Sequence, residues 1–343
     1  MEEAPTAFEG SPTPTRRPTS AAAEEILGGY FPVLDHGFVA LVDYMGDDAS
    51  VERAARVSYG YGTRKVSMTR GLLRYLRRHL HTTPSEMVEL CFHCSMPIFV
   101  ARQWVRHRTA SVNEYSGRYS LMPLLFYNPR REHFALQSGS SNQGRATGDA
   151  DAELYAEAVR RWEAVRSQVA ADYGWLAGEN VARELARIDL PLSTYTQWYW
   201  KIDLHNLLHF LTLRVDEHAQ WEIQEYGRVI AAMVKRVAPI SYEAWIDYQV
   251  MGDRLSRGEL RALARLVAAD EGGVAARPDA SLSDGDLGGL GLSKREIREL
   301  KAKLAPRDVP DFELDVSQMR SPERAAEDAL AAVPGAGGGQ SGP

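Results

Sequence analysis

The stretch RHRTASVNEYSGRYS, from Arg106 to Ser120, decides how this sequence is interpreted. It places arginine, histidine, asparagine, glutamate and serine side by side, whereas a packed core segment is mostly apolar. An arginine fork binds a phosphate through paired hydrogen bonds, and serine hydroxyls and glycine N–H groups can complete a phosphate cradle. Glu114 has the wrong charge for a phosphate and suits a ribose hydroxyl, a base N–H or one of the arginines. The stretch therefore predicts a site for one or more phosphorylated ligands.

The composition fits a folded protein of one or two domains. The chain has 343 residues, of which 44% are hydrophobic, and this is enough to bury a substantial core. A formal net charge of -6 argues against a general nucleic-acid binder. The two cysteines imply no disulfide framework and favour a cytoplasmic location. No apolar run approaches the roughly 20 residues of a membrane span, and the N-terminus lacks the pattern of a signal peptide.

Periodicity predicts a globular region, residues 29–254, between two irregular ends. Residues 1–28 predict a disordered lead, and residues 255–343 predict an extension that is partly helical, at 293–304, and partly disordered. The expected strands and helices of the globular region follow from period-2 and period-3.6 patterns. They are strands at 37–46 and 193–202, and helices at 48–57, 68–80, 97–108, 150–174, 179–188, 203–215 and 217–236.

Three local patterns carry further expectations. Thr83-Pro84-Ser85-Glu86 matches a capping box with proline at the first helical position, which predicts a helix start. Residues 87–96 could continue that helix or form a strand, and their composition favours the strand. In the helix at 68–80 the leucines at positions 72, 73, 76 and 80 share one face. The segment from Thr109 onward has poor helix propensity and predicts a loop.

Other patterns suggest competing functions. The CFHC sequence, Cys91 to Cys94, has the spacing of a redox or zinc motif, but no second pair exists and small apolar fillers are the simpler interpretation. His205 and His209 have zinc-ligand spacing without the glutamate of a zinc hydrolase. A nucleic-acid-binding module is the other class, using the arginines at 53–78 and at 106–118 as a phosphate-tracking surface. The alternative is that these arginines form a solvated helix face.

The stretch from Arg106 to Tyr119 resembles the signature RHRxxSxNExSxRY of the flavin-dependent thymidylate synthases and matches every specified position. Further blocks resemble the same family over about residues 30–250. These blocks are HTTPSEMVELCFHCSMPIFVARQWVRHR (81–108), ARELARIDLPLSTYTQWYW (182–200) and LRVDEHAQWEIQEY (213–226).

The resemblance implies a fold and a reaction. The expected fold is α+β, with helices around a central, mostly antiparallel sheet in a single catalytic domain, 29–254, that assembles as a homotetramer with active sites between subunits. FAD, reduced by NADPH, is expected to take part in moving the methylene group of methylenetetrahydrofolate onto C5 of dUMP. A hydride from the flavin then gives dTMP without a cysteine nucleophile. Neither a metal ion nor nucleic acid is an expected partner.

The resemblance also assigns roles to single positions. Arg214 is the expected catalytic residue, because it matches the arginine that polarises the uracil ring. His81 matches a histidine near the flavin and the folate. The expected dUMP contacts are Gln103, Arg106, Glu114, Ser116, Gly117, Arg118, Arg187 and Arg214. The expected FAD contacts are Ser58, Thr83, Glu86, Arg106, His107, Arg108, Glu114, Asp203, His205 and His209.

The last three FAD positions depart from the family pattern. Many members have asparagine, arginine and asparagine where this chain has Asp203, His205 and His209, and these positions touch FAD from a neighbouring subunit. A carboxylate repels a phosphate, so Asp203 is expected to face the ribose or the adenine instead.

Overall fold

The computed structural model describes residues 16–58, 69–139, 144–146, 148, 150–270 and 272–331. The chain divides into two compact units. The first comprises Met1–Tyr242 and Phe312–Pro343, and the second comprises Glu243–Asp311. The boundary expected between residues 254 and 255 lies inside the second unit.

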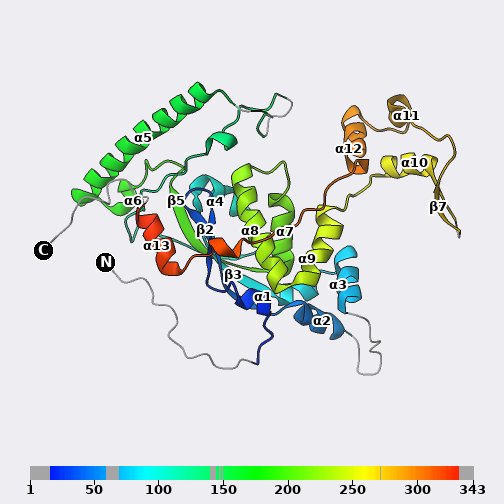
Figure 1. Cartoon of the computed structure of the whole chain (residues 1–343), viewed down its shortest axis with the longest axis horizontal. Helices are drawn as coiled ribbons and strands as arrows, with labels where there is room; N and C mark the ends of the chain where they lie inside the picture. The colour runs from blue at the N-terminus through cyan, green and yellow to red at the C-terminus, as the bar shows by residue number, and fades with distance from the viewer. Residues whose placement is uncertain are drawn as a thin grey trace. The chain divides into compact units, whose positions relative to one another are not determined.

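A five-stranded sheet with the order β1-β2-β3-β5-β4 forms the centre of the first unit (Figure 1). Every pairing in it is antiparallel, so the expected α+β fold is confirmed. The strands are β1 (Tyr30–Val33), β2 (Gly37–Met45), β3 (Glu89–Pro97), β4 (Ser111–Glu114) and β5 (Tyr195–Asp203).

Helices cover one face of this sheet, and Figure 1 shows α7 and α8 side by side over it. The helices of the first unit are α1 (Ala21–Glu24), α2 (Asp48–Arg56), α3 (Thr69–Arg78), η1 (Thr83–Met87), α4 (Ile98–Trp104), η2 (Arg131–His133), α5 (Ala152–Gly178), α6 (Arg183–Ala186), α7 (Leu204–Arg214), α8 (Trp221–Val237), η4 (Val316–Gln318) and α13 (Pro322–Ala331). The helix α9 (Pro239–Trp245) runs from the first unit into the second.

Trp104 joins the sheet to its helices. Its ring stands edge-on to Trp198 and Trp200 of β5, with ring centroids 5.5 and 5.1 Å away. It stacks on Phe210 of α7 at 5.1 Å and meets Tyr226 of α8 at 5.8 Å. Only 1% of the Trp104 surface is exposed. One side chain at the end of α4 therefore fixes the positions of the three elements that surround it.

Two expectations about local structure are wrong. The T-P-S-E sequence does not start an α-helix, because η1 is a short 3-10 helix whose N-cap is Thr82 and makes no side-chain cap bond. The segment after Thr109 is not only loop, because β4 pairs with β5 along its whole length. Local propensity favoured a loop there, but the unpaired edge of β5 supplies hydrogen-bond partners that local propensity ignores.

The amphipathic face of α3 also differs from the expected one. Leu73 and Leu76 are buried as expected, but Leu80 lies beyond the helix and is 58% exposed. Arg77 takes a buried place instead, 8% exposed, and burial lowers its pKa to about 10. The arginines at 53–78 therefore do not form one solvated face, and Arg64 lies outside the described residues.

The first and last described segments of the chain contact the body of the first unit. Part of the expected disordered lead forms α1, and Ala23 of this helix and Ile26 just after it are fully buried, while residues 1–15 lie outside the described residues. Near the other end, the backbone of Arg320 pairs with Tyr30 of β1 through two hydrogen bonds of 2.9 and 3.0 Å. The Phe312 N–H donates to the hydroxyl of Tyr242.

The second unit has its own small core. Ala262, Leu287, Leu290, Leu292, Ile297 and Leu300 pack together there. Its elements are η3 (Ile246–Val250), α10 (Arg257–Leu266), β6 (Val267–Asp270), β7 (Gly273–Ala276), α11 (Asp284–Gly289) and α12 (Lys294–Leu304).

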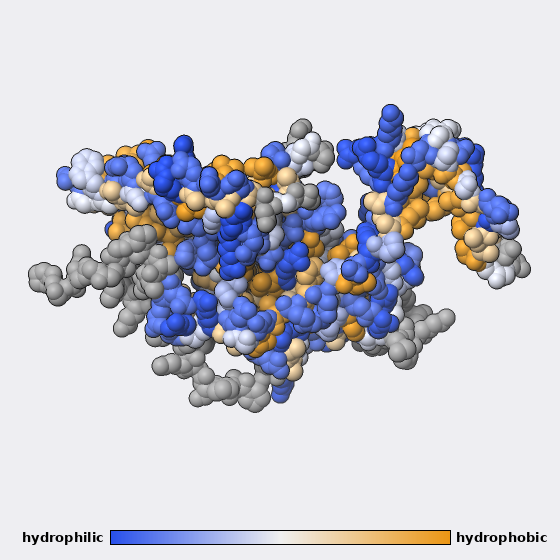
Figure 2. All heavy atoms as spheres, turned by 45° about the horizontal axis from the view of Figure 1, so that its top comes forward, coloured by the Kyte–Doolittle hydropathy of each residue, from blue (hydrophilic) through white to orange (hydrophobic). Residues whose placement is uncertain are grey.

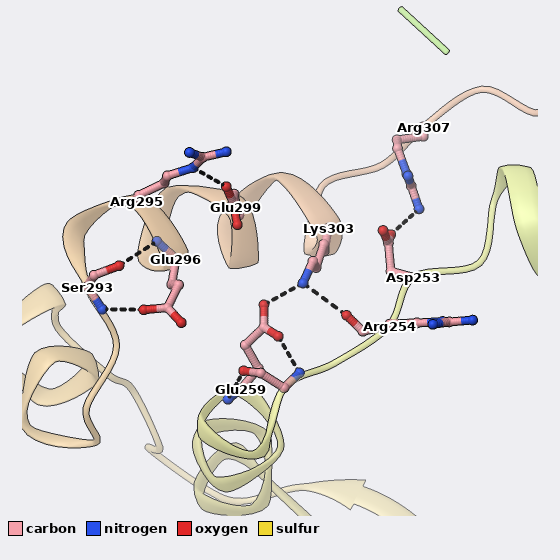
Figure 3. A network of polar contacts seen from close by, with 10 residues as sticks. Asp253, Arg254, Glu259, Ser293, Arg295, Glu296, Glu299, Lys303 and Arg307 are labelled. Atoms are coloured by element: carbon pink, nitrogen blue, oxygen red, sulfur yellow. Dashed lines mark hydrogen bonds and ion pairs between the residues drawn. The ribbon is translucent and has the colours of Figure 1, made fainter. Parts of the chain in front are cut away.

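Capping boxes start the helices of this second unit. The side chains of Ser256, Ser283 and Ser293 each accept a hydrogen bond from the backbone N–H three residues later. The acidic side chain at that later position accepts in return from the backbone N–H of the serine. Lys303 joins α12 to α10 through a 2.7 Å ion pair with the buried Glu259 (Figure 3). The helix expected at 293–304 is confirmed. In the described part of the whole chain, no helix has the length and apolar character needed to cross a bilayer.

We expect Trp104→Ala to lower the free energy of unfolding by about 3–5 kcal/mol, because it leaves a large cavity between the sheet and its helices. Trp104→Phe should cost less, since the buried Nε1 of Trp104 has no hydrogen-bond partner among the described residues. Chemical denaturation followed by circular dichroism measures both. Val274→Ala is the control, because this side chain is 76% exposed and its truncation should change stability by less than about 0.5 kcal/mol. Equal losses in the two alanine variants would contradict the assignment.

Candidate active site

Arg214, the last residue of α7, is held by two contacts from the segment at the end of α4. Its Nε donates to Nε2 of His107 at 3.0 Å, and its Nη2 donates to the carbonyl oxygen of Gln103 at 3.2 Å. Trp104 and Phe210 lie between these elements and fix their spacing. The expected catalytic arginine is therefore held in one orientation by the backbone and by an imidazole.

The protonation state of His107 follows from this geometry. Burial, the Arg214 charge and the neighbouring His209 together lower the pKa of His107 to about 4. The ring is then neutral at pH 7, and its Nε2 must carry a lone pair because it accepts from Arg214. The proton of the neutral ring is on Nδ1. Arg214 keeps its charge, since a guanidinium is not deprotonated in this pH range.

A cavity of about 1130 Å³ lies beside Arg214. One part of its lining comes from residues 213–224, which include the end of α7 and the first turn of α8, and another comes from described residues of the segment 132–148. Gln103 also lines it, and its Nε2 donates to Oε1 of Gln220 at 2.6 Å. The cavity is large enough for a nucleotide together with part of a second ligand.

Several expected FAD contacts gather around α7. A second, smaller cavity of about 210 Å³ is lined by Arg106, His107, Arg108, Asn206 and His209, among others. This cavity combines two guanidinium groups with imidazole and amide groups, which is a donor set suited to a phosphate or to the polar edge of a heterocycle.

The remaining expected FAD contacts lie on the neighbouring elements. η1, which carries Thr83 and Glu86, contacts both α7 and α2, and Ser58 follows the end of α2. His205 of α7 faces this side, where burial and the Arg77 charge lower its pKa while Asp203 and Glu86 act in the opposite direction. Its Nδ1 is buried and has no hydrogen-bond partner among the described residues. His81 and Thr83 are both exposed.

Asp203 has a structural task in this chain. It is the N-cap of α7, and its oxygens accept from the backbone N–H of Asn206 at 2.9 Å and from Nδ2 of the same residue at 2.7 Å. A carboxylate at this position is favourable because it meets the positive end of the helix dipole.

The other expected dUMP contacts form a separate group. Gly117 is buried against Arg187, because a Cβ at Gly117 would lie 3.0 Å from Arg187 Cδ and 2.7 Å from Met122 Sδ. Arg118 pairs with Glu184 at 2.9 Å, and both side chains are more than half exposed. This local packing explains why the sequence has glycine between Ser116 and Arg118: any side chain there would displace the arginine.

Glu114 belongs to the same group through β4. It lies at the end of the exposed edge strand, where its Oε1 accepts from the hydroxyl of the buried Thr196 at 2.8 Å. The cavity beside Arg214 is not lined by Glu114, Ser116, Gly117, Arg118 or Arg187. Within one chain, therefore, Gln103 and Arg214 line the larger cavity, Arg106 lines the smaller one, and the other expected dUMP residues form this second group.

The structure also reveals residues that sequence reasoning did not single out. His133, Arg145 and Trp221 line the Arg214 cavity, with the His133 and Trp221 rings stacked at 3.5 Å. His218 lines the same cavity. The block 213–226 contains Trp221, but no local pattern connects it to residues some 80 positions earlier in the chain.

The metal and dithiol alternatives gain no support. Among the described residues, no group of three or more His, Cys, Asp or Glu side chains is placed to hold a metal ion. Cys91 and Cys94 are three apart on β3 and therefore point to opposite faces of the sheet. Both are free, and Cys94 is fully buried, so the interpretation of this residue as a core filler is confirmed.

Comparison with known proteins identifies the family. Residues 40–240 match the family model described as "Thymidylate synthase complementing protein". The chain is 49% identical over 302 residues to the flavin-dependent thymidylate synthase of Gluconobacter oxydans, covering 87% of this chain and 95% of that protein. It is 48% identical over 295 residues to the enzyme of the same name from Ruegeria pomeroyi, covering 84% and 92%. These alignments are longer than the range 30–250, so similarity extends beyond the part expected from sequence.

A solved structure supports the same conclusion. The UMP/dUMP methylase PolB from Streptomyces cacaoi, bound with 5-Br dUMP, superposes with a TM-score of 0.58 at 31% identity, covering 63% of this chain and 97% of that one. The family model matches more than half of the chain, and the two relatives are close to half identical to it along most of their length. Together these matches establish the family. The chain belongs to the family of flavin-dependent thymidylate synthases.

Proposed function

We propose that this protein makes dTMP from dUMP, with methylenetetrahydrofolate as the one-carbon donor, NADPH as the reductant and FAD as the cofactor. The observation that carries the proposal is the position of Arg214, whose charged guanidinium is fixed at the edge of a nucleotide-sized cavity by His107 and Gln103. The relatives named as thymidylate synthases and the methylase bound with a dUMP analogue support the same substrate.

Arg214 has the properties needed to activate the uracil ring. A methyl group can be built at C5 only if electron density rises there, and ionisation at N3 raises it. A fixed cation beside the ring stabilises that anion, and the neutral state of His107 leaves the positive charge on Arg214 alone. The arginine is also half-buried, so less water screens its charge.

The residues around α7 fit FAD. Arg106 and Arg108 supply charge for its phosphates, while His209, Asn206 and the unpaired Nδ1 of His205 supply groups for its polar edges. When bound, FAD supplies the hydride that completes the methyl group. Because Asp203 already caps α7, we place its carboxylate away from the phosphates, on the side of the ribose or adenine.

The cysteines are poorly suited to act as nucleophiles. Burial raises the pKa of the Cys91 and Cys94 thiols, so neither forms a thiolate readily. A route without a cysteine nucleophile agrees with this chemistry, and the protein then contributes orientation and charge rather than a covalent intermediate.

We further propose that a second copy of the chain completes each site, within a homotetramer. The group around Glu114, Ser116, Arg118 and Arg187 has the donors for a nucleotide but faces solvent in one chain. Large apolar side chains are exposed close to it in sequence, among them Tyr119, Trp175, Ile188 and Leu192, each at least 62% exposed. Figure 2 shows orange apolar side chains at the surface of the α5 region. Burying such residues favours association.

Replacing Arg214 tests the catalytic assignment. We expect Arg214→Ala to keep FAD, because the residues of the α7 cavity remain, but to lose nearly all conversion of dUMP to dTMP. Turnover with methylenetetrahydrofolate and NADPH, together with flavin absorbance, measures both. Arg261→Ala, an exposed arginine of α10, should behave like the wild type. Near wild-type turnover in the Arg214 variant would refute the role.

Mixing two inactive variants tests the shared site. Arg214→Ala and Arg187→Ala damage different groups, so an oligomer that contains both subunits should regain intact sites. Random assembly should restore about a quarter of the wild-type activity per site. Co-expression with two affinity tags yields the mixed oligomer for assay. If the mixed oligomer forms but stays inactive, both groups serve the same chain's site and the proposal is wrong.

A titration tests the proton state of His107. The proposed role of Arg214 requires a neutral imidazole beside it at working pH. In the folded protein we expect the NMR signal of the His107 ring to titrate near pH 4, whereas an exposed histidine titrates near 6.5. His107→Gln, which retains an acceptor for Arg214, identifies the signal. A midpoint near 6.5 would mean that the Arg214 contact does not persist in solution.

A further inference from the structure

An ion pair attaches the described part of the segment 131–146, which is residues 131–139 and 144–146, to the first turn of α8. Nη2 of Arg145 lies 2.5 Å from Oε1 of Glu222, and its Nη1 donates to the carbonyl oxygen of His133 at 3.0 Å. The guanidinium also lies over the Trp221 ring, 5.8 Å from its centroid. Arg145 therefore connects two points of its own segment with α8.

Glu222 is an unusual partner because it is almost completely buried, with 2% of its surface exposed. Its Oε1 accepts a second bond, of 3.0 Å, from the Tyr127 hydroxyl, while Oε2 has no partner among the described residues. A buried carboxylate without a counter-charge is costly. Arg145 provides that counter-charge, and removing it would leave the carboxylate uncompensated, so the pairing holds the segment strongly in place.

This ion pair is connected to the residues that hold Arg214. His133 stacks on Trp221. The residue before Trp221 is Gln220, whose side chain accepts a hydrogen bond from the Gln103 side chain. The carbonyl of Gln103 in turn accepts from Arg214. The first turn of α8 thus meets the Gln103 contact on one side and the segment 131–146 on the other. His133, Arg145 and Trp221 all line the Arg214 cavity.

We propose that Arg145 is a positioning residue for the substrate cavity. Through its ion pair with Glu222 and its bond to His133, it holds residues 131–139 and 144–146 against α8 before the ligand arrives, so that dUMP meets a preformed cavity. This inference rests on the proposed function for the identity of the ligand, but the positioning itself does not. Arg145 is not required to touch the reacting atoms.

The expected effect is on affinity rather than on turnover at saturation. If loss of the ion pair leaves the segment in place one tenth of the time, the apparent Kd for dUMP rises about tenfold, because only the competent fraction binds. Saturating dUMP restores the bound form, so kcat should change little. A residue with a purely structural role would lower stability without this separation of KM from kcat.

The test compares Glu222→Gln, Arg145→Ala, Arg145→Lys and the double variant Arg145→Ala/Glu222→Gln in the FAD-loaded protein. We measure dUMP affinity by calorimetry, KM and kcat by turnover, and hydrogen exchange of residues 131–146 without ligand. Glu222→Gln and Arg145→Ala should each raise Kd and KM about tenfold and speed exchange at the Ala146 amide, which bonds to Leu136 at 2.8 Å. Arg145→Lys should recover part of the affinity, and the double variant should be no worse than either single variant.

Arg295→Ala is the matched control, because it removes an ion pair of similar length, 2.7 Å to Glu299, on the exposed face of α12 (Figure 3). It should leave affinity and exchange unchanged. Variants of Arg145 or Glu222 that melt earlier but keep wild-type affinity and exchange would overturn the proposal. If the wild type itself binds no dUMP, the proposed function fails, and hydrogen exchange alone then tests the positioning role of Arg145. Faster exchange of residues 131–139 and 144–146 in Glu222→Gln would support that role. Unchanged exchange would refute it.

Discussion

The packing of Trp104 is the constraint on which the site depends. Its ring is enclosed by Trp198, Trp200, Phe210 and Tyr226, which come from β5, α7 and α8. Gln103 precedes it in the chain, and Arg106, His107 and Arg108 follow it after Val105. Since Trp104 cannot shift without opening a cavity, the residues beside it are delivered to α7 at a fixed distance. The hydrogen bonds to Arg214 are possible because this aromatic cluster sets the spacing first.

Electrostatics then determines what each charged residue can do. His107 is kept neutral by burial and by Arg214, so the arginine has a hydrogen-bond acceptor rather than a competing cation. On the other side of the cavity, Glu222 and Arg145 neutralise each other. Arg214 is therefore held in place with its charge available to a ligand, whereas the charge of Arg145 is neutralised by Glu222. The sequence alone does not distinguish the roles of Arg214 and Arg145, because these roles depend on the partner that each side chain meets in the fold.

The separation of the residues expected to bind the nucleotide follows from the sheet. β4 is an edge strand with Glu114 at its end, and shortly after it Gly117 packs against Arg187 while Arg118 pairs with Glu184. The Arg214 cavity is instead lined by residues 213–224 and by described residues between 132 and 148. An edge strand with a polar end and exposed apolar neighbours agrees with the proposal that a second copy completes the site.

The sequence by itself determined the family, most of the elements and the types of residue in the site. The signature at 106–119 and strong local periodicity at β2, β5, α7 and α8 were sufficient, because these signals depend on residues close together in the chain. Tertiary structure alone decided that the segment after Thr109 pairs as β4 and that T-P-S-E forms no capping box. It also decided that Arg77 is buried and that Arg145 pairs with Glu222. It also decided the proton state of His107. Each of these depends on a partner tens of residues away or on local burial, and neither propensity nor spacing contains that information.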